Sequence, residues 1–191
     1  GAHSMALAGH CKSIGKILCV ELDKRLVEAC NVNIEINSLG GKVKCVQGDA
    51  GSWARCYIRK RKKLLELNQN LQTETAESVS KTNENHTKTI ENNLETIETE
   101  SPQKPKTDFE EQYDVLLVDP PRQGLDQSVI DLAINCNFKH FLYVSCGHNA
   151  LVRDLGRLND FFEVKNVLLT DLFPRTDCVE TLVHLVRRES I

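Results

Sequence analysis

Residues 113–122 read Tyr-Asp-Val-Leu-Leu-Val-Asp-Pro-Pro-Arg, an apolar run that ends on an acid, two prolines and an arginine. A second apolar run, Phe-Leu-Tyr-Val at residues 141–144, leads into Ser145 and Cys146. Ligands of open α/β sheets bind in the crevice beyond the carboxyl ends of the parallel strands. The two runs therefore predict neighbouring strands whose ends present the Asp119 carboxylate and the Cys146 thiol to one substrate.

Strand-like and helix-like segments alternate on both sides of these runs, which predicts an α/β fold with a parallel sheet. The predicted strands cover residues 16–21, 43–46, 115–118, 141–144, 164–169 and 181–186. The predicted helices cover residues 23–37, 127–135 and 150–158. The connection between the last two strands is too short for a helical crossover, so we expect these strands to pair antiparallel.

The chain opens on Gly1 to Ala8, Gly-Ala-His-Ser-Met-Ala-Leu-Ala, which has the pattern of a glycine-rich turn running into a helix. A nucleotide-binding sheet places a strand before such a turn, and the glycines let the backbone approach the ligand. We therefore expect the sheet to lack its first, central strand. The alternative is that the first five residues are an expression remnant.

A polar segment divides the predicted domain into two parts, residues 1–58 and 110–191. The intervening residues 59–109 begin with the basic run Arg59–Lys63, and from about 66 to 107 they contain no aromatic residue and no glycine. Such a segment buries too little apolar surface to offset its loss of chain entropy. The pattern predicts a disordered insertion.

The composition, 40% hydrophobic and 27% charged over 191 residues, suits one globular domain with a packed core. The formal charge of −3 excludes a strong overall basic field, so contacts to RNA would have to come from local patches. Arg59–Lys63 is one such patch, although a run of this kind is also typical of a solvated helix face.

The eight cysteines show no paired C-x-x-C spacing, which predicts reduced core residues for most of them and no metal site. No apolar run approaches the ~20 residues of a membrane span, and the N-terminus lacks a charged segment followed by an apolar core. We expect a soluble intracellular protein, cytoplasmic or nuclear, with mitochondria left open.

Two further acids follow predicted strands. Glu21 lies where α/β nucleotide folds keep an acid for ribose hydroxyls, but it would equally suit an exposed helix start. Asp49 would either contact the base of a nucleoside or cap the helix that follows it. Both alternatives stay open for each residue.

The prolines after Asp119 fix the backbone and remove two donors, so the carboxylate would meet a ligand at a set angle. Arg122 suits a phosphate or a pyrimidine carbonyl. Without a ligand, the segment would be a stiffened loop that carries no chemistry.

Cys146 is the candidate nucleophile, because it precedes the predicted helix at 150–158, whose dipole favours a thiolate. Otherwise it is one more small buried apolar residue. Glu180, at the mouth of the last strand, is the candidate base, and the turn at 173–176 would direct the chain toward the site.

The chain contains three separated motifs. In chain order they are Asp119-Pro-Pro-Arg-Gln-Gly124, then Tyr143-Val-Ser-Cys146 with Arg153-Asp154-Leu155, and then Asp171-Leu-Phe-Pro-Arg-Thr176 followed by Glu180. Together they resemble the RNA 5-methyluridine methyltransferases, the family of tRNA (uracil-5-)-methyltransferases. The resemblance covers the chain from Gly1 to about Arg188 outside the insertion.

The resemblance implies the Rossmann-like sheet of class I S-adenosylmethionine-dependent methyltransferases. It implies that Gly1 to Ala8 end the loop that holds the cofactor, that Glu21 binds the cofactor ribose and that Asp119 belongs to the cofactor pocket. With Asp49, these residues make the candidate site for S-adenosyl-L-methionine.

The resemblance also implies methylation of uridine C5 in RNA, tRNA foremost. A Cys146 thiolate would add to C6 of uracil, C5 would take the methyl group, and Glu180 would remove the C5 proton. Arg122 would help to hold the target nucleotide, which must be flipped out of its stack.

The chain departs from the family pattern at Gly147-His148, where a polar residue and a proline are usual, and at Cys178, where a histidine is usual. The family's RNA-binding region is expected to be absent, which leaves open that the chain alone is inactive. Two other functions also stay open: a non-catalytic RNA-binding or scaffolding fragment, and an amino-group methyltransferase that uses only the Asp119-Pro-Pro turn.

Overall fold

The structure is a computed structural model that describes residues 1–81, 108, 111–172, 174–176 and 179–189, with the side chains of 71–81 left out. The chain forms two compact units. The first comprises Gly1–Ile58 with Gln112–Ile191, and the second comprises Arg59–Glu111. The candidate site residues all belong to the first unit.

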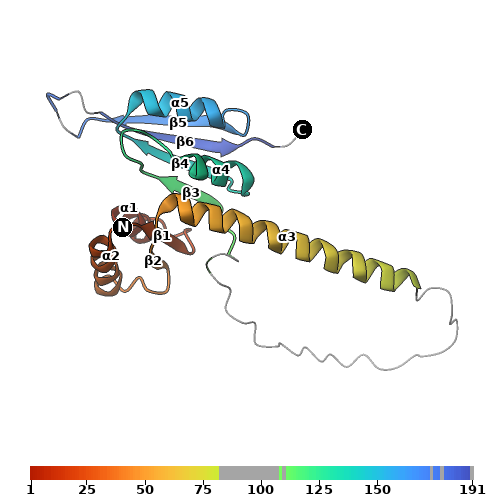
Figure 1. Cartoon of the computed structure of the whole chain (residues 1–191). Helices are drawn as coiled ribbons and strands as arrows, with labels where there is room; N and C mark the ends of the chain where they lie inside the picture. The colour runs from red at the N-terminus through yellow and green to blue at the C-terminus, as the bar shows by residue number, and fades with distance from the viewer. Residues whose placement is uncertain (82–107, 109–110, 173, 177–178, 190–191) are drawn as a thin grey trace. The chain divides into compact units, whose positions relative to one another are not determined.

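The helices are α1 (Ala2–His10), α2 (Lys24–Ile36), α3 (Ala50–Lys81), α4 (Gln127–Asn135) and α5 (His148–Leu158). The strands are β1 (Ile17–Glu21), β2 (Val43–Gln47), β3 (Val115–Val118), β4 (His140–Ser145), β5 (Phe162–Thr170) and β6 (Glu180–Arg187). Helices and strands alternate as far as β5 (Figure 1), so the predicted α/β fold is confirmed.

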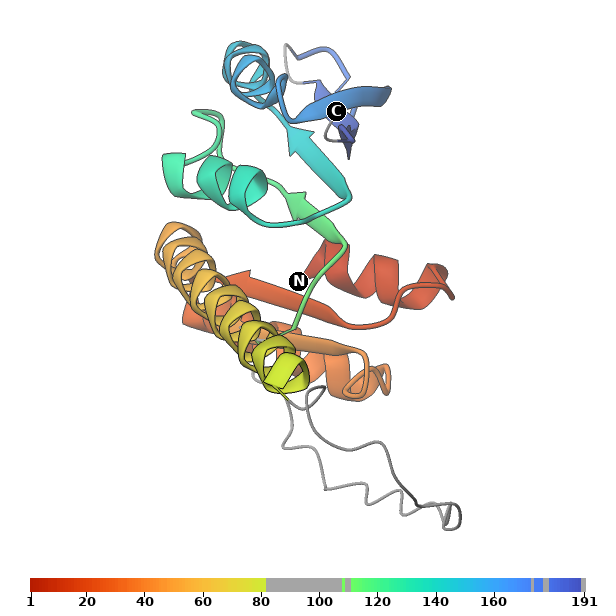
Figure 2. The ribbon, with the colours of Figure 1, turned by 90° about the vertical axis from the view of Figure 1, so that its right-hand side faces the viewer.

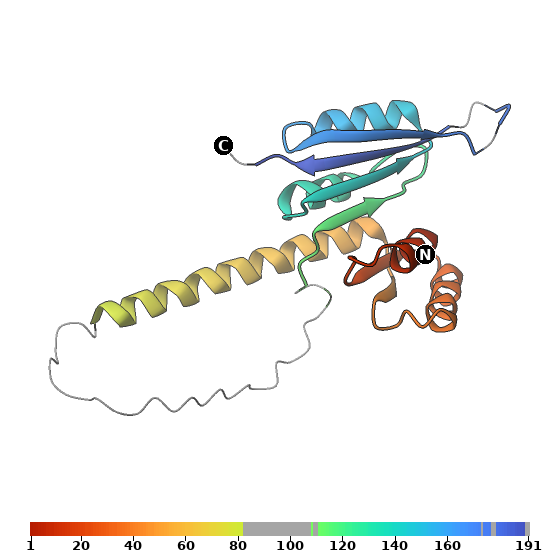
Figure 3. The ribbon, with the colours of Figure 1, turned by 180° about the vertical axis from the view of Figure 1, so that it is seen from behind.

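The strands form a two-stranded sheet, β1-β2, and a four-stranded sheet in the order β3-β4-β6-β5. β1 pairs parallel with β2 and β3 pairs parallel with β4, whereas β6 runs antiparallel to both β4 and β5. Figure 3 shows the arrow of β6 opposed to those of β3 and β4. The predicted antiparallel pair is confirmed. None of the described strands pairs with the outer edges of β1 and β3.

The larger core lies between the four-stranded sheet and the helices α4 and α5, which cover the same face of it (Figure 2). Alternation along β4 turns Phe141 and Tyr143 toward these helices, and Val183 and Leu185 do the same on β6. This period of two is the pattern of a strand with one buried face.

A smaller core joins α1 and α2 to the two-stranded sheet. Asp23 begins α2, where its Oδ1 accepts a hydrogen bond from the Arg25 amide at 2.8 Å. The buried residues of α2 then recur at helical spacing. The buried members of this core are Ala8, Val27, Cys30, Ile34, Val43 and Cys45.

α3 differs from the expectation that the pattern dissolves after Trp53, because the helix continues to Lys81. Leu, Gln, Glu, Lys and Arg are strong helix formers, and no glycine or proline interrupts residues 52–81. The prediction of disorder was therefore wrong for residues 66–81, and for residues 82–107 it lies outside the described part of the chain. Among the described helices, none is both long and apolar enough to cross a membrane.

Candidate active site

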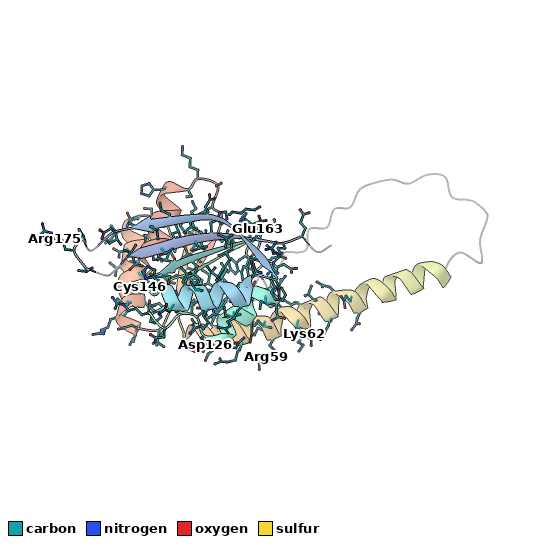
Figure 4. All side chains as sticks on the ribbon, turned by 90° about the horizontal axis from the view of Figure 1, so that it is seen from above. Arg59, Lys62, Asp126, Cys146, Glu163 and Arg175 are labelled. Carbon is teal, nitrogen blue, oxygen red and sulfur yellow. The ribbon has the colours of Figure 1, made fainter. Side chains whose placement is uncertain are left out.

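Cys146 follows the last residue of β4 and lines a cavity of about 330 Å³. Figure 4 labels the side chain at the end of the sheet where α5 begins. The cavity is lined by Arg122, Cys146, Gly147, His148, Asn149 and Ala150. The parallel strands β3 and β4 therefore end side by side, as the sequence predicts, and Arg122 and Cys146 line one cavity. Asp119, which was predicted to face the same substrate as Cys146, is not among the residues that line this cavity.

Most residues that line this cavity, Gly147–Ala150, belong to the start of α5. Gly147 is the N-cap and offers no side chain to the free amides of the first turn. Free amides at a helix start favour a nearby negative charge, here a thiolate or a phosphate. Sequence reasoning noted Gly147 and His148 only as departures from a pattern, whereas both line the cavity.

Gly147 also marks the closest approach between the two strand ends. A Cβ atom built at this position would overlap the backbone carbonyl oxygen of Arg122. Because that neighbour is backbone, it cannot rotate away as a long side chain could. Glycine at position 147 therefore lets the Asp-Pro-Pro-Arg turn lie directly against the residue after the thiol.

Gly147→Ala is expected to destabilise the fold by about 1–3 kcal/mol, because the methyl group must displace one of two packed backbones. The matched control is Gly156→Ala in the same helix, where a Cβ would meet nothing within 4 Å. That change should stabilise the fold by about 0.5–1 kcal/mol, because alanine is the better helix former. Urea unfolding of both variants measures the difference, and equal effects would contradict the close approach.

The turn after Asp119 is held by its own backbone and by α5. The Gly124 amide donates to the Pro121 carbonyl at 2.9 Å, and Gly124 has a φ of +85°, which glycine adopts without strain. Arg153 reaches back from α5 and donates from Nη2 to the Gln123 carbonyl at 2.8 Å. These bonds fix the position from which Arg122 faces the cavity.

Asp154 is fully buried and joins the elements that hold the turn after Asp119 in place. Its Oδ2 accepts from the Leu125 amide at 2.8 Å and from the Tyr143 hydroxyl at 2.9 Å. Its Oδ1 accepts from Arg153 Nε at 3.0 Å and from Arg157 Nη1 at 3.2 Å. One carboxylate thus joins the turn, β4 and α5.

The ionisation of this network follows from its contacts. Burial by itself raises the pKa of Asp154, but the hydrogen bonds from Leu125, Tyr143 and Arg153 outweigh it and leave the pKa below its usual value. Burial, followed by the hydrogen bond to Asp154, raises the pKa of Tyr143. The phenol therefore stays a donor and the carboxylate stays charged at neutral pH.

Glu180 lies at the same end of the sheet as the thiol. Ser145, the last residue of β4, is the register partner of Thr181 on β6. Cys146 comes one residue after Ser145 and Glu180 one residue before Thr181, so both flank the same antiparallel pair. Glu180 is partly buried and is not among the residues that line the described cavity. Phe173 and Cys178 lie outside the described residues.

Glu21 ends β1 and Asp49 follows β2, so the two acids lie at the same end of the parallel two-stranded sheet. Glu21 is the register partner of Gln47, and the Gly48 amide donates to the Glu21 carbonyl at 2.9 Å. Asp49 Oδ1 accepts from the Ser52 amide at 2.8 Å, and this bond lowers the pKa of Asp49. Asp49 therefore caps α3, which was one of the two alternatives for it. Glu21 Oε1 accepts from the Asp23 amide at 3.0 Å.

Asp119 meets the start of α1 through a residue that sequence reasoning missed. Its Oδ2 lies 2.9 Å from Nε2 of His3. Gly1 caps the same helix and packs so closely on Cys30 that a Cβ there would overlap the sulfur. Two of the predicted cofactor residues, Gly1 and Asp119, therefore both lie at the start of α1, because Asp119 contacts His3 in the first turn of the helix that Gly1 caps. His3 is part of the opening glycine-rich segment, which was the only sequence signal for it.

Comparison with known families gives one match that covers more than half of the chain. The sequence model described as tRNA (Uracil-5-)-methyltransferase matches residues 84–188. An uncharacterized RNA methyltransferase of Leptospira interrogans is 40% identical over 75 residues, 39% of this chain and 16% of that protein. One of Clostridium acetobutylicum is 40% identical over 83 residues, 43% of this chain and 18% of that protein. The chain spans less than a fifth of the length of these relatives.

Among solved structures, the chain is similar to that of Pyrococcus abyssi tRNA (uracil-54, C5)-methyltransferase in complex with S-adenosyl-L-homocysteine. The TM-score is 0.59 at 17% identity, and the match covers 97% of this chain and 32% of that one. At this identity the likeness shows a shared fold.

Proposed function

Because the chain belongs to the tRNA (uracil-5-)-methyltransferase family, we propose that it carries the nucleophile and the base of an enzyme that methylates uridine C5 in RNA, tRNA foremost. The main support for the proposal is that Cys146 and Arg122 line the same cavity. The register places Glu180 beside the same strand ends.

Cys146 and Glu180 would supply the nucleophile and the base that methylation of uracil C5 requires. C5 of uracil is a poor nucleophile, so the Cys146 thiolate adds to C6 and leaves an enolate whose C5 can take a methyl group. Glu180 then accepts the C5 proton, the electron pair restores the double bond, and the bond from sulfur to C6 breaks. The thiolate is regenerated and the carboxylic acid returns its proton to water.

S-adenosyl-L-methionine supplies the electrophilic methyl group when it is bound. The donor set at the strand ends fits this cofactor, because Glu21 presents a carboxylate, which can accept bonds from two ribose hydroxyls. The close packing of Gly1 on Cys30 leaves backbone rather than side chain at the start of α1, where a ligand can approach. Asp119, joined to His3, would border the same pocket.

Arg122 is proposed to hold the target nucleotide. Arg122 lines the cavity together with Cys146, and a guanidinium can bond a phosphate or a pyrimidine carbonyl in a fixed geometry. The base reaches the thiol only after it leaves its stack, which costs a few kcal/mol. Contacts from Arg122 and from the amides at the start of α5 would offset part of this cost.

The test is a covalent trap, made with this chain and with the natural protein that carries it. tRNA that contains 5-fluorouridine should form a complex that survives denaturation in the presence of S-adenosyl-L-methionine, because fluorine at C5 cannot leave as a proton. Mass spectrometry should locate the attached nucleotide on the peptide that contains Cys146. The same tRNA with ordinary uridine is the control and should be released.

Two other outcomes identify the competing functions. RNA binding without any complex or methyl transfer in the natural protein would indicate a non-catalytic RNA-binding or scaffolding protein. Methylation of a nucleobase amino group without a complex would indicate an amino-group methyltransferase that uses the Asp119-Pro-Pro turn alone. Either outcome would contradict the proposed chemistry.

A further inference from the structure

Three cysteines from three different elements meet in the smaller core. Cys19 lies on β1, Cys30 on α2 and Cys45 on β2, and their sulfur atoms all lie within 4.8 Å of one another. Cys19 and Cys45 are register partners in the parallel pair, so their side chains leave the sheet on the same face. The sequence predicts no metal site, because no two of these residues have the spacing of a ligand pair.

The surroundings of the cluster are apolar. Cys30 and Cys45 are 4% and 8% exposed, and the neighbouring buried side chains are aliphatic, with Val27, Ile34 and Val43 among them. Burial first, and then the neighbouring thiols, raise the pKa of Cys45 to about 12. Cys19 is only partly buried, which leaves an entry path.

We propose that Cys19, Cys30 and Cys45 form a binding site for one soft metal ion, Cu(I), with three thiolate ligands. Metal–thiolate bonds of about 2.3 Å in a trigonal arrangement separate the sulfurs by about 4 Å, so the side chains need to move by less than about 1 Å. Thiolate donors select soft ions such as Cu(I).

The number of ligands favours Cu(I) over zinc. Structural zinc sites are almost always four-coordinate. Among the described residues, the group offers three sulfurs and no histidine or carboxylate as a fourth ligand. The competing explanation is that the thiols are small apolar core residues without a ligand.

The experiment uses the whole chain under anaerobic conditions, with Cu(I) supplied from a chromogenic competing chelator. One Cu(I) per chain should be retained, and X-ray absorption should show a first shell of three sulfurs. Cys30→Ala and Cys45→Val should each lower the affinity by at least about 100-fold, since second-best ligands would have to come from outside the cluster. Cys136→Ala, which removes a buried cysteine from the other core, is the matched control and should retain the ion.

Acid should weaken the binding. Each ligand must lose its proton before it binds, so protons compete with Cu(I), and the affinity should fall as the pH falls. A bound ion should also raise the thermal stability of the chain, because it binds the three gathered thiolates of the folded state more tightly than the separated cysteines of the unfolded chain.

Three results would overturn the site: no retained Cu(I), equal retention in Cys30→Ala and the unaltered chain, or a first shell of nitrogen and oxygen. Cys45→Val is included because valine suits a buried strand position, so this variant is expected to fold. Circular dichroism checks the fold of the variant. If that variant folds and still binds Cu(I) at full affinity, the cluster is an ordinary part of the core.

Discussion

Replacing Cys146 by alanine is expected to lower uracil methylation by roughly 10⁴-fold or more, with little change in RNA affinity. Without the thiolate, no adduct forms at C6 and C5 keeps its poor nucleophilicity. The measurement is transfer of labelled methyl groups to tRNA by the natural protein that carries this chain, with the product nucleoside identified by mass spectrometry. Cys11→Ala is the control, because Cys11 is also partly buried but lies outside the cavity.

A companion change separates the thiol from the base. Glu180→Gln should still form the adduct and transfer the methyl group, but release should slow by roughly 10²–10⁴-fold, so methylated RNA stays attached to the protein. Glu163→Gln on β5 is the control (Glu163 is labelled in Figure 4), since Glu163 is half exposed and forms an ion pair with Lys165. Full turnover in Cys146→Ala, or prompt release in Glu180→Gln, would contradict the assigned chemistry.

Asp154→Ala is expected to lower the free energy of unfolding by about 3–5 kcal/mol, because it leaves buried donors without their acceptor. Leu125, Tyr143 and Arg153 would all lose a charged partner. Domains of this size are stable by only about 5–15 kcal/mol, so much of the variant would unfold on mild heating. Urea unfolding measures the change. Glu163→Gln, which removes an exposed ion pair, should change the free energy of unfolding little.

The same carboxylate makes stability depend on pH. The pKa of Asp154 is lowered in the fold, so its contribution is complete above the unfolded value of about 3.9 and is lost as the pH falls through the lower folded value. Asp154→Asn should lack this part of the acid sensitivity. An identical acid transition in that variant and in the unaltered chain would show that Asp154 does not carry the charge in the folded state.

The strands and the two C-terminal helices were predictable because their signal is local. Alternation in β4 and β6 and helical spacing in α4 reflect one buried face each, and the structure reproduces all of them to within about two residues. The meeting of Arg122 with Cys146 was predictable for a related reason. Parallel neighbours end at the same edge, so two strand-end motifs converge without further information.

Other features depend on contacts that no local pattern encodes. His3 and Asp119 are separated by 116 positions, and their contact depends on how α1 lies beside β3. The cluster of Cys19, Cys30 and Cys45 requires the register of β1 on β2 as well as the rotation of α2. α3 was misjudged because low apolar content argues against a packed core but not against an exposed helix built from strong helix formers.

The antiparallel placement of β6 between β4 and β5 has an evolutionary corollary. The separation between the backbone positions of Cys146 and Glu180 is set by a ladder of hydrogen bonds that runs from His140 and Val186 to Ser145 and Thr181. It is not set by the connection between β5 and β6. Insertions or deletions in that connection can therefore change the surroundings of the proposed nucleotide site while the distance between the two proposed reacting groups is inherited unchanged.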